Sequence, residues 1–279
     1  MALRLKIVDE AIVSIITLLS DFGLKDPYVA EMKAVILSIH PQACIVDITH
    51  EIEKFNIRMG AFVLASATTY FPPGTIHVAV VDPGVGTKRR PIIVETKRSY
   101  YVGPDNGLLM LAVQKEGVGH VYHVNNPQYM LPRVSRTFHG RDIFAPVAAH
   151  LARGHPPSEF GPEIQGYALP EFAKPHVGEG ELLGEVLHID DFGNIVSNIS
   201  AEGLEKMGIR EECSLRVKLD SETLMLKLCS AYGEVPARTP LAIIGSGDFL
   251  EVSVNQGSAS RTFKAKIGDS LRVSLASSN

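Results

Sequence analysis

The first half of the chain alternates short β-branched runs with longer segments of helical apolar spacing, and this alternation restricts the fold more than any other feature. Strand-like runs at 12–20, 43–49 and 75–83 are separated by helical patterns at 28–41 and 56–72. Strands that are buried on both faces and connected through helices form mostly parallel sheets. We therefore predict an α/β N-terminal domain built on a mostly parallel sheet with helices on both faces.

The amino-acid composition changes between Gly154 and Gly184, where prolines and glycines alternate along the chain. Such a composition suits a crossing segment better than a regular element. Beyond it, short strand-like runs are separated by turn residues, with one helical pattern around 201–207. We predict an N-terminal domain at 1–175 and a small all-β barrel or sandwich domain at 176–279.

Charge and cysteine usage exclude several classes of function. The formal net charge is -4, and the lysines and arginines are scattered along the chain. This distribution does not favour nucleic acid as a partner. The three cysteines, Cys44, Cys213 and Cys229, form no CxxC pair or disulfide framework. They indicate a reduced, cytoplasmic protein.

The apolar run at 11–20 is the one candidate for a targeting segment. Asp9 and Glu10 precede it, and no small-residue cleavage site follows. It is also shorter than the roughly 20 apolar residues that a membrane-spanning helix needs. We predict a buried strand here and no membrane partner.

Polar residues follow several of the predicted strands directly. They are Asp21 with Phe22, the segments 47–50 and 103–107, and the segment 82–86. The carboxyl ends of parallel strands share one edge of a sheet, so a common cleft is expected there. Simpler roles are open as well: Asp21 could cap the next helix, His50 could lie at the surface, and 103–107 could be a plain turn.

The segment VVDPGVGTKRRP places Asp82 at the end of an apolar run, seven residues before Arg89. A carboxylate and a guanidinium joined by a glycine-rich turn favour a functional site. The turn has neither the P-loop nor the dinucleotide-binding pattern, and a strand rather than a helix follows it. Phosphate binding is therefore not favoured.

Two further clusters carry polar residues in defined settings. His139 and Asp142 precede a helical pattern, where Asp142 could act as the cap. Asp190, Phe192 and Asn194 lie at a strand-turn-strand junction and could bind a nucleoside or an amino acid. A β-turn with a buried Phe192 would explain the same residues.

Metal and serine-nucleophile chemistry have little support in the sequence. The chain has no HExxH motif for a metal and no GxSxG elbow for a serine nucleophile. A hydrolase that gathers its Asp and His residues around a metal stays open as an alternative.

Six motifs, taken in order, resemble those of one family. They are ITLLSDFGLKDPYVAEMKAVI, VVDPGVGTKRRPI, YVGPDNGLL, TFHGRDIFAPVAAHLA, IDDFGNIVSNI and IGSGDFLEVSVNQGSAS. Over nearly its whole length, the chain resembles the S-adenosyl-L-methionine (SAM) hydroxide adenosyltransferases, or SAM hydrolases. These are related to the SAM-dependent fluorinating and chlorinating enzymes. The resemblance implies a larger α/β domain followed by a small β barrel.

The resemblance also implies the reaction, with SAM as substrate and no metal or other cofactor. Hydroxide attacks the ribose C5′ and releases adenosine and methionine. The catalytic residues of the family fall on Asp82, Arg89 and His139. The family forms a homotrimer whose sites lie between the α/β domain of one subunit and the barrel of the next. Substrate-binding positions are implied at Asp21, Phe22, Gly140, Asp190, Phe192, Asn194, Ser246, Val254 and Gln256.

These residue types suit the roles that the resemblance gives them. We expect Asp82 to orient the water, with Arg89 and His139 completing the network. An aspartate paired with an arginine is a weak base, so His139 is the better titrating group, although Arg89 would push its ring towards neutrality. Which group removes the proton stays open at this point. Carboxylates accept hydrogen bonds, so Asp21 suits the ribose hydroxyls and Asp190 the methionine ammonium. Two further alternatives stay open: a non-catalytic sensor of SAM or adenosine, and a halogenase. The carboxylate of Asp82 disfavours the halogenase, because it would repel a halide ion.

Overall fold

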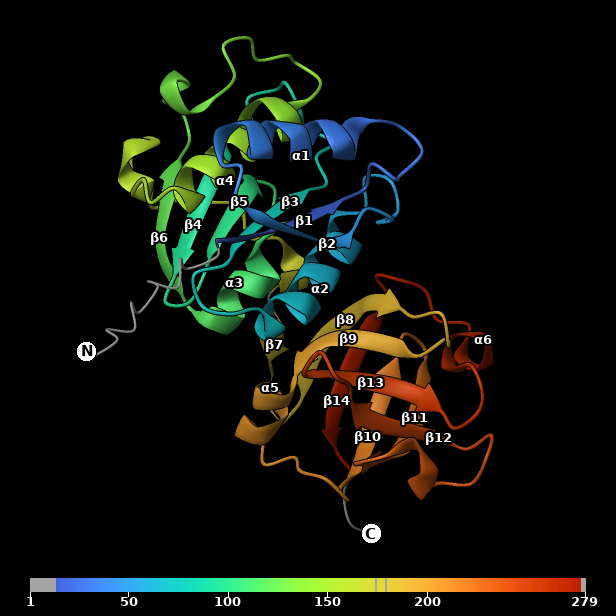
Figure 1. Cartoon of the computed structure of the whole chain (residues 1–279). Coiled ribbons are helices and arrows are strands. Elements are labelled where there is room, and N and C mark those ends of the chain that lie inside the picture. Colours follow the sequence, from blue (N-terminus) through green and yellow to red (C-terminus); the bar gives the residue numbers. More distant parts are fainter. Residues whose placement is uncertain (1–13, 174, 179, 277–279) are drawn as a thin grey trace, which may run out of the picture.

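A six-stranded sheet organises the first half of the chain (Figure 1). A computed structural model describes residues 14–173, 175–178 and 180–276. The strands of this sheet are β1 (Ile15–Ser20), β2 (Cys44–Thr49), β3 (Ile76–Val80), β4 (Pro91–Thr96), β5 (Tyr100–Pro104) and β6 (Val118–His123). Their order is β2-β1-β3-β5-β4-β6, and only β4 runs against the others. The predicted mostly parallel sheet is confirmed.

Helices cover both faces of this sheet, as predicted. On one face, α1 (Tyr28–Ile39) packs with α4 (Ala145–Ala152), and on the other α2 (Ile57–Ala67) packs with α3 (Met110–Glu116). Each pair buries an apolar stripe against the strands, which is the arrangement that a helical spacing of apolar residues favours.

The reversed direction of β4 brings two distant parts of the sequence motif together. Both β3 and β5 run in one direction, and β4 runs in the opposite direction. The carboxyl end of β3 and the amino end of β4 therefore lie at the same edge of the sheet. Asp82 follows β3 and Arg89 precedes β4. The strand direction therefore places both residues at the carboxyl edge of the parallel strands.

The second sheet closes into a barrel of seven strands, with β7 (His176–Val177) added beside β8. The barrel strands are β8 (Leu182–Ile189), β9 (Ile195–Ser200), β10 (Ser214–Leu219), β11 (Glu222–Cys229), β12 (Pro240–Ile244), β13 (Phe249–Val254) and β14 (Ser270–Leu275). Pairing of β14 with β8 closes the ring. Burial alternates along β10, as expected for a wall with one inward face. A barrel is thus confirmed over a sandwich.

Two helices accompany the barrel. The helix α5 (Ala201–Lys206) coincides with the helical pattern expected around 201–207. The helix α6 (Ala259–Phe263) was not predicted, because its five residues are too few to show a helical period. The division at residue 175 stays a prediction; every described strand belongs to one sheet or the other.

The helices α2 and α3 face the barrel (Figure 1). The ring of Phe62 stacks on His188 with centroids 4.9 Å apart, and it lies 6.0 Å from the ring of Phe249. Beside these rings, Arg58 pairs with Glu185 at 2.8 Å. One apolar core cluster therefore spans both bodies.

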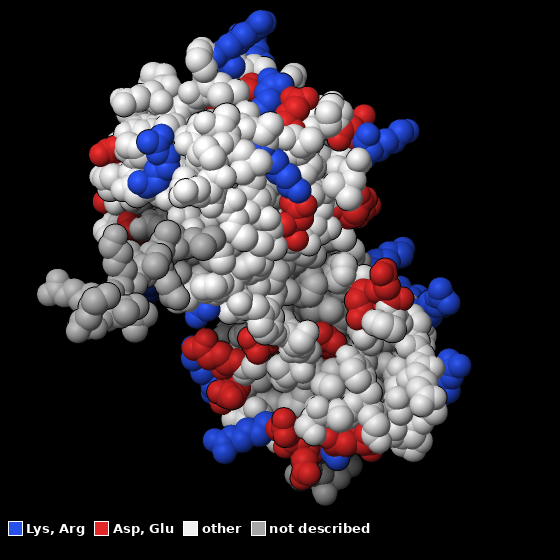
Figure 2. Space-filling model, viewed as in Figure 1, with Lys and Arg blue, Asp and Glu red and all other residues white. Residues whose placement is uncertain are grey.

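The visible surface carries mixed charge. Figure 2 shows lysine and arginine side chains interspersed with acidic ones rather than gathered into one patch. Within 14–173, 175–178 and 180–276, no helix is long and apolar enough to cross a membrane. The predicted strand at 11–20 forms over Ile15–Ser20, and residues 11–13 lie outside the described residues.

Candidate active site

Asp82, Arg89 and His139 form one hydrogen-bonded network. The Nε of Arg89 lies 2.9 Å from both carboxylate oxygens of Asp82, and its Nη2 also donates to Oδ2. The same Nη2 donates to Nδ1 of His139 at 2.9 Å. The side chains of Asp82 and Arg89 are only 5% and 9% exposed, so solvent screens this pair weakly. The structure brings the three predicted catalytic residues together.

The hydrogen bond from Arg89 fixes the proton arrangement of His139. A guanidinium can only donate, so Nδ1 accepts and the proton of the neutral ring lies on Nε2. Burial lowers the pKa of His139, and the charge of Arg89 lowers it further. His139 is therefore neutral near pH 7, as expected, and its ring can offer an N–H to a ligand.

The glycine-rich turn after Asp82 has a packing role. Gly86 has a φ of +73°, and a Cβ there would lie 2.2 Å from the backbone oxygen of Arg136. Any side chain would push the turn away from the segment that carries His139. The turn motif therefore holds Asp82 and Arg89 against His139, and this close approach explains the need for glycine.

The network borders a pocket of about 330 Å³ at the carboxyl edge of the sheet. Phe22, Tyr28 and Phe138 form an aromatic wall, with ring centroids 5.1 to 5.8 Å apart. A Cβ on Gly140 would come within 3.1 Å of Phe138 and 3.3 Å of Phe22. Gly140 thus keeps the space between the rings open.

His139 precedes one turn of π-helix, η3 (Gly140–Phe144), which leads into α4. Such π-turns occur often at functional sites. Asp142 lies inside this turn, fully buried, and accepts bonds at 2.7 Å from the Ser135 N–H and from Arg141 Nε. The expectation that Asp142 caps the helix was wrong; it fixes the segment before His139 instead.

Asp21 also lines this pocket, but it does not cap α1. The N-cap position of α1 is Pro27, which has no side-chain hydrogen bond there. The carboxylate of Asp21 accepts the N–H of Phe55 at 2.9 Å, and Lys54 donates to its carbonyl. Phe55 has a φ of +65°, a costly conformation for such a residue, and 68% of it is exposed. Asp21 therefore anchors a strained segment at the rim of the pocket.

Two of the four strand-end loops stay outside the pocket. His50 is buried, contrary to expectation, and its ring bonds Ser20 Oγ at 2.7 Å and Asp47 at 3.1 Å. In the loop 103–107, Asp105 pairs with Arg90 and accepts the N–H of Ala168 at 2.7 Å. These two loops brace the neighbouring chain segments. Of the four strand-end loops, those of Asp21 and Asp82 line the cleft.

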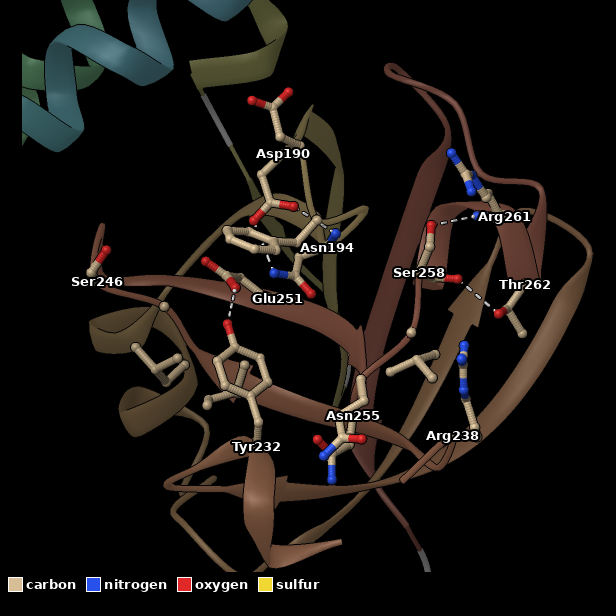
Figure 3. Close-up of a pocket in the computed structure, with 18 residues that line it drawn as sticks. Asp190, Asn194, Tyr232, Arg238, Ser246, Glu251, Asn255, Ser258, Arg261 and Thr262 are labelled. Atoms are coloured by element: carbon tan, nitrogen blue, oxygen red, sulfur yellow. Dashed lines mark hydrogen bonds between the residues drawn. The ribbon is translucent and has the colours of Figure 1, made fainter. Parts of the chain in front are cut away.

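A second pocket, of about 1090 Å³, lies in the barrel domain (Figure 3). It contains the remaining predicted substrate-binding residues: Asp190, Phe192, Asn194, Ser246, Val254 and Gln256. The lining residues of this pocket and those of the α/β pocket are different sets. Within one chain, the predicted site is therefore divided between two places.

The turn from Asp190 to Asn194 is rigid although it lies at the surface. The two oxygens of Asp190 accept the N–H and the side-chain amide of Asn194 at 2.8 and 2.9 Å. Gly193 has a φ of +85° and lies against Ser258. Phe192 is 81% exposed, so the alternative of a β-turn with a buried ring is wrong. An exposed ring on a fixed turn suits contact with a ligand or another chain.

Sequence reasoning missed Glu251 and Tyr232 in the barrel pocket. Tyr232 Oη donates to Glu251 at 3.3 Å, as Figure 3 shows. Burial raises the pKa of Glu251, and the charge of Asp190 raises it further. The sequence signal for Glu251 was an acidic residue within the apolar run FLEVSV. Such a residue is also typical of an outward-facing position in an ordinary strand, so it did not stand out.

The residues considered for a metal site are not arranged as ligands. In the described ranges 14–173, 175–178 and 180–276, no three His, Cys, Asp or Glu side chains form a group that could hold a metal ion. His50 and Asp142 take part in the local hydrogen bonds described above.

Comparison with known proteins gives the family. Residues 16–161 match the model of the SAM hydroxide adenosyltransferase N-terminal domain, and residues 184–272 match that of the C-terminal domain. The chain belongs to the SAM hydroxide adenosyltransferase family. Its two family domains coincide with the sheet that carries Asp82 and with the barrel that carries Asp190.

Named relatives agree with this family. The chain is 38% identical over 262 residues to an (R)-S-adenosyl-L-methionine hydrolase of Thermus thermophilus, covering 91% of this chain and 97% of the relative. It is 30% identical to a fluorinase of Actinopolyspora mzabensis, covering 93% and 96%. A crystal structure of an uncharacterized conserved protein from Thermotoga maritima aligns with a TM-score of 0.83 and 40% identity, covering 93% and 99%.

Proposed function

We propose that this protein hydrolyses SAM to adenosine and L-methionine, with Asp82, Arg89 and His139 as catalytic residues. The observation that carries the proposal is the hydrogen-bonded network of these three residues beside the α/β pocket, in which the side chains of Asp82 and Arg89 are almost fully buried. The hydrolase relatives, which match nearly the whole chain, indicate the substrate. In this reaction a water oxygen bonds to the ribose C5′ while the C5′–S bond breaks. The electron pair of the C5′–S bond stays on sulfur, so the sulfonium becomes the neutral thioether of methionine.

The hydrogen bonds of the network assign a role to each group. His139 uses Nδ1 to accept from Arg89, so its Nε2–H donates to the water oxygen and cannot take a proton from it. Asp82 has lone pairs beyond those used by Arg89 and lines the pocket, so it accepts the proton that leaves the water. Arg89 stabilises the developing hydroxide from a buried position.

The remaining pocket residues hold the substrate in line for attack. Asp21 receives the ribose hydroxyls, the ring of Phe22 packs against the nucleoside, and Gly140 leaves room for C5′. Substitution needs the water at about 3 to 3.5 Å from the carbon and opposite to the leaving sulfur. No metal or other cofactor takes part in this proposal, because a sulfonium is already an activated leaving group.

In our proposal the barrel pocket of a neighbouring subunit completes the site, and the assembly is the homotrimer that the family resemblance implies. The division of the predicted residues between two pockets of one chain supports this. So do the exposed apolar side chains near both pockets: Leu24 and Phe55 are 68% exposed, and Phe192 is 81% exposed. In the joined site Asp190 binds the methionine ammonium, while Phe192, Asn194, Ser246, Val254 and Gln256 contact the rest of SAM.

We also propose a cytoplasmic location. The three cysteines, Cys44, Cys213 and Cys229, are all free thiols, which suits a reducing compartment.

Product analysis in oxygen-18 water tests the function. Purified protein is incubated with SAM, with and without EDTA and with and without chloride, and the products are separated with mass detection. We expect adenosine that carries the label at O5′, together with methionine, in every tube. Intact SAM in all tubes would refute the activity. A 5′-chloro product in place of labelled adenosine would support the halogenase, and loss of activity in EDTA would support the metal hydrolase.

A further inference from the structure

The turn that carries Ser246 is attached to the α/β domain of its own chain. It connects β12 to β13 and is closed by a bond from the Asp248 N–H to the Gly245 carbonyl at 3.0 Å. One side of the turn borders the barrel pocket, where Figure 3 shows Ser246 at the edge. The carbonyl groups of Ser246 and Gly247 accept hydrogen bonds from α/β side chains.

Lys115, in the last turn of α3, makes the stronger of these contacts. Its Nζ donates to the carbonyl of Gly247 at 2.6 Å and lies 4.7 Å from the centre of the Phe249 ring. The side chain is 20% exposed, and burial lowers the pKa of Lys115. Asp248 lies 3.9 Å from the ammonium, beyond hydrogen-bond length. The Gly247 carbonyl is therefore the main hydrogen-bond partner of a partly desolvated charge.

Tyr70 makes the second contact, from the short helix η1 (Thr68–Tyr70). Its hydroxyl donates to the carbonyl of Ser246 at 3.3 Å. The two donors hold successive carbonyls, so they fix the Ser246–Gly247 and Gly247–Asp248 peptide groups. The turn needs such support, because Gly247 has no side chain to restrict its backbone and Asp248 has a φ of +62°.

We propose that Lys115, assisted by Tyr70, is a positioning residue for substrate: it holds the Ser246–Gly247 turn so that Ser246 faces the barrel pocket. This inference rests on the proposed function, in which Ser246 contacts SAM. Without Lys115 the turn samples several conformations, and SAM must order it on binding. The loss therefore falls on KM, and the chemistry at Asp82 continues at nearly its normal rate.

Steady-state kinetics of matched variants test this role. Lys115→Met removes the donor and keeps the length of the side chain, whereas Lys115→Arg restores a donor. We expect Lys115→Met to raise KM for SAM about fivefold with kcat within about twofold, since it loses one charge-assisted hydrogen bond. Lys115→Arg should recover most of the wild-type KM. Tyr70→Phe should have a smaller effect in the same direction.

Arg58→Met is the control for a purely structural clamp. Arg58 also joins the two domains, through Glu185 at 2.8 Å, but it does not contact the turn. We expect Arg58→Met to lower the melting temperature as Lys115→Met does, and to leave KM unchanged. An equal rise of KM in both variants would show that Lys115 acts only by joining the domains, and would overturn the inference.

A double-mutant cycle with Ser246→Ala separates positioning from an independent contact. If Lys115 acts through Ser246, the double variant has a KM close to that of Ser246→Ala alone. Additive increases of KM in the double variant, or an unchanged KM in Lys115→Met, would overturn the inference about Lys115. The proposed function would still stand in that case, provided that the wild type hydrolyses SAM. If the wild type binds SAM without hydrolysing it, the proposed hydrolase function is refuted. The variants should then change the Kd for SAM in the way described here for KM. If the wild type does not bind SAM, both fail.

Discussion

The α/β pocket and the barrel pocket differ in how their side chains are held. In the α/β pocket, Asp82 and Arg89 are at most 9% exposed and bond to each other and to His139. In the barrel pocket, Phe192 is 81% exposed on a turn that is itself rigid. The smaller pocket, of about 330 Å³, offers fixed polar groups, and the larger, of about 1090 Å³, offers an open surface.

This difference separates two tasks of a substitution reaction. Groups that stabilise a transition state must be oriented before the substrate arrives, because reorganisation would cost activation energy. Groups that capture a substrate or a partner chain can be exposed, because their burial on binding supplies the affinity. We therefore expect substitutions in the α/β pocket to lower kcat, and substitutions in the barrel pocket to raise KM.

Asp82→Asn should have the largest effect. It removes the proton acceptor and should lower kcat about a thousandfold with little change in KM. Steady-state kinetics with SAM measure both constants. Asp105→Asn is the matched control, since Asp105 is also 5% exposed and paired with an arginine, yet lies outside the pocket. An equal fall of kcat in both variants would mean that Asp82 acts only through stability.

Gly140→Ala should come next. The added methyl group would lie 3.1 to 3.3 Å from Phe138, Met32 and Phe22, so it displaces the aromatic wall and misaligns the ribose. We expect kcat/KM to fall on the order of tenfold to a hundredfold. Gly166→Ala, where a Cβ meets nothing within 4 Å, should leave the constant unchanged. Full activity in Gly140→Ala would show that the substrate does not enter this pocket.

Phe192→Ala should affect binding alone. We expect KM to rise about tenfold through loss of an aromatic contact, with kcat within about threefold. The melting temperature of the subunit should not change, because the ring is 81% exposed. Met225→Ala, 59% exposed elsewhere on the barrel, is the control. A fall in kcat with an unchanged KM would contradict the separation of tasks.

The dependence of rate on pH should show the smallest effect. Burial and then the charge of Arg89 lower the pKa of His139, so the ring is already neutral at its ordinary value of about 6.5. We expect kcat/KM to be nearly constant from there upward, and to fall at lower pH as Nδ1 is protonated and its bond from Arg89 is lost. If kcat/KM instead fell with a midpoint above about pH 6.5, the ordinary pKa of histidine, the result would contradict the proton arrangement assigned to His139.

The sequence allowed much of the fold to be predicted. Apolar periodicity predicted β1, β2, β3, α1 and α2, but it did not predict α3 or β6. The short strand-like runs after residue 184 indicated a barrel or a sandwich, and the family resemblance favoured the barrel. The partnership of Asp82 with Arg89 followed from their place at either end of one turn. Burial of His50 was not predictable, because its partners Ser20 and Asp47 come from two different strands.

Other features depend on tertiary context that no local pattern carries. The π-turn at Gly140–Phe144 resembles an ordinary helix start in the sequence, which led to the wrong role for Asp142. Exposure of Phe192 contradicts the usual preference of an aromatic ring for burial. Lys115 and the turn that it contacts are 132 residues apart in sequence, so only the packing of the two domains relates them.

Subunit mixing tests the central claim most directly, namely that the two pockets of different chains form one site. Asp82→Asn subunits, which we expect to have almost no activity, and Phe192→Asp subunits, which we expect to have a strongly raised KM, are co-expressed with different tags and purified through both. Activity is measured at a SAM concentration far below that raised KM, where each variant alone is nearly inactive. In the proposed trimer, each mixed assembly then contains one site with both halves intact, so we predict about one third of the wild-type activity. Mixed assemblies as inactive as their parents would contradict the claim and place the whole site within a single chain.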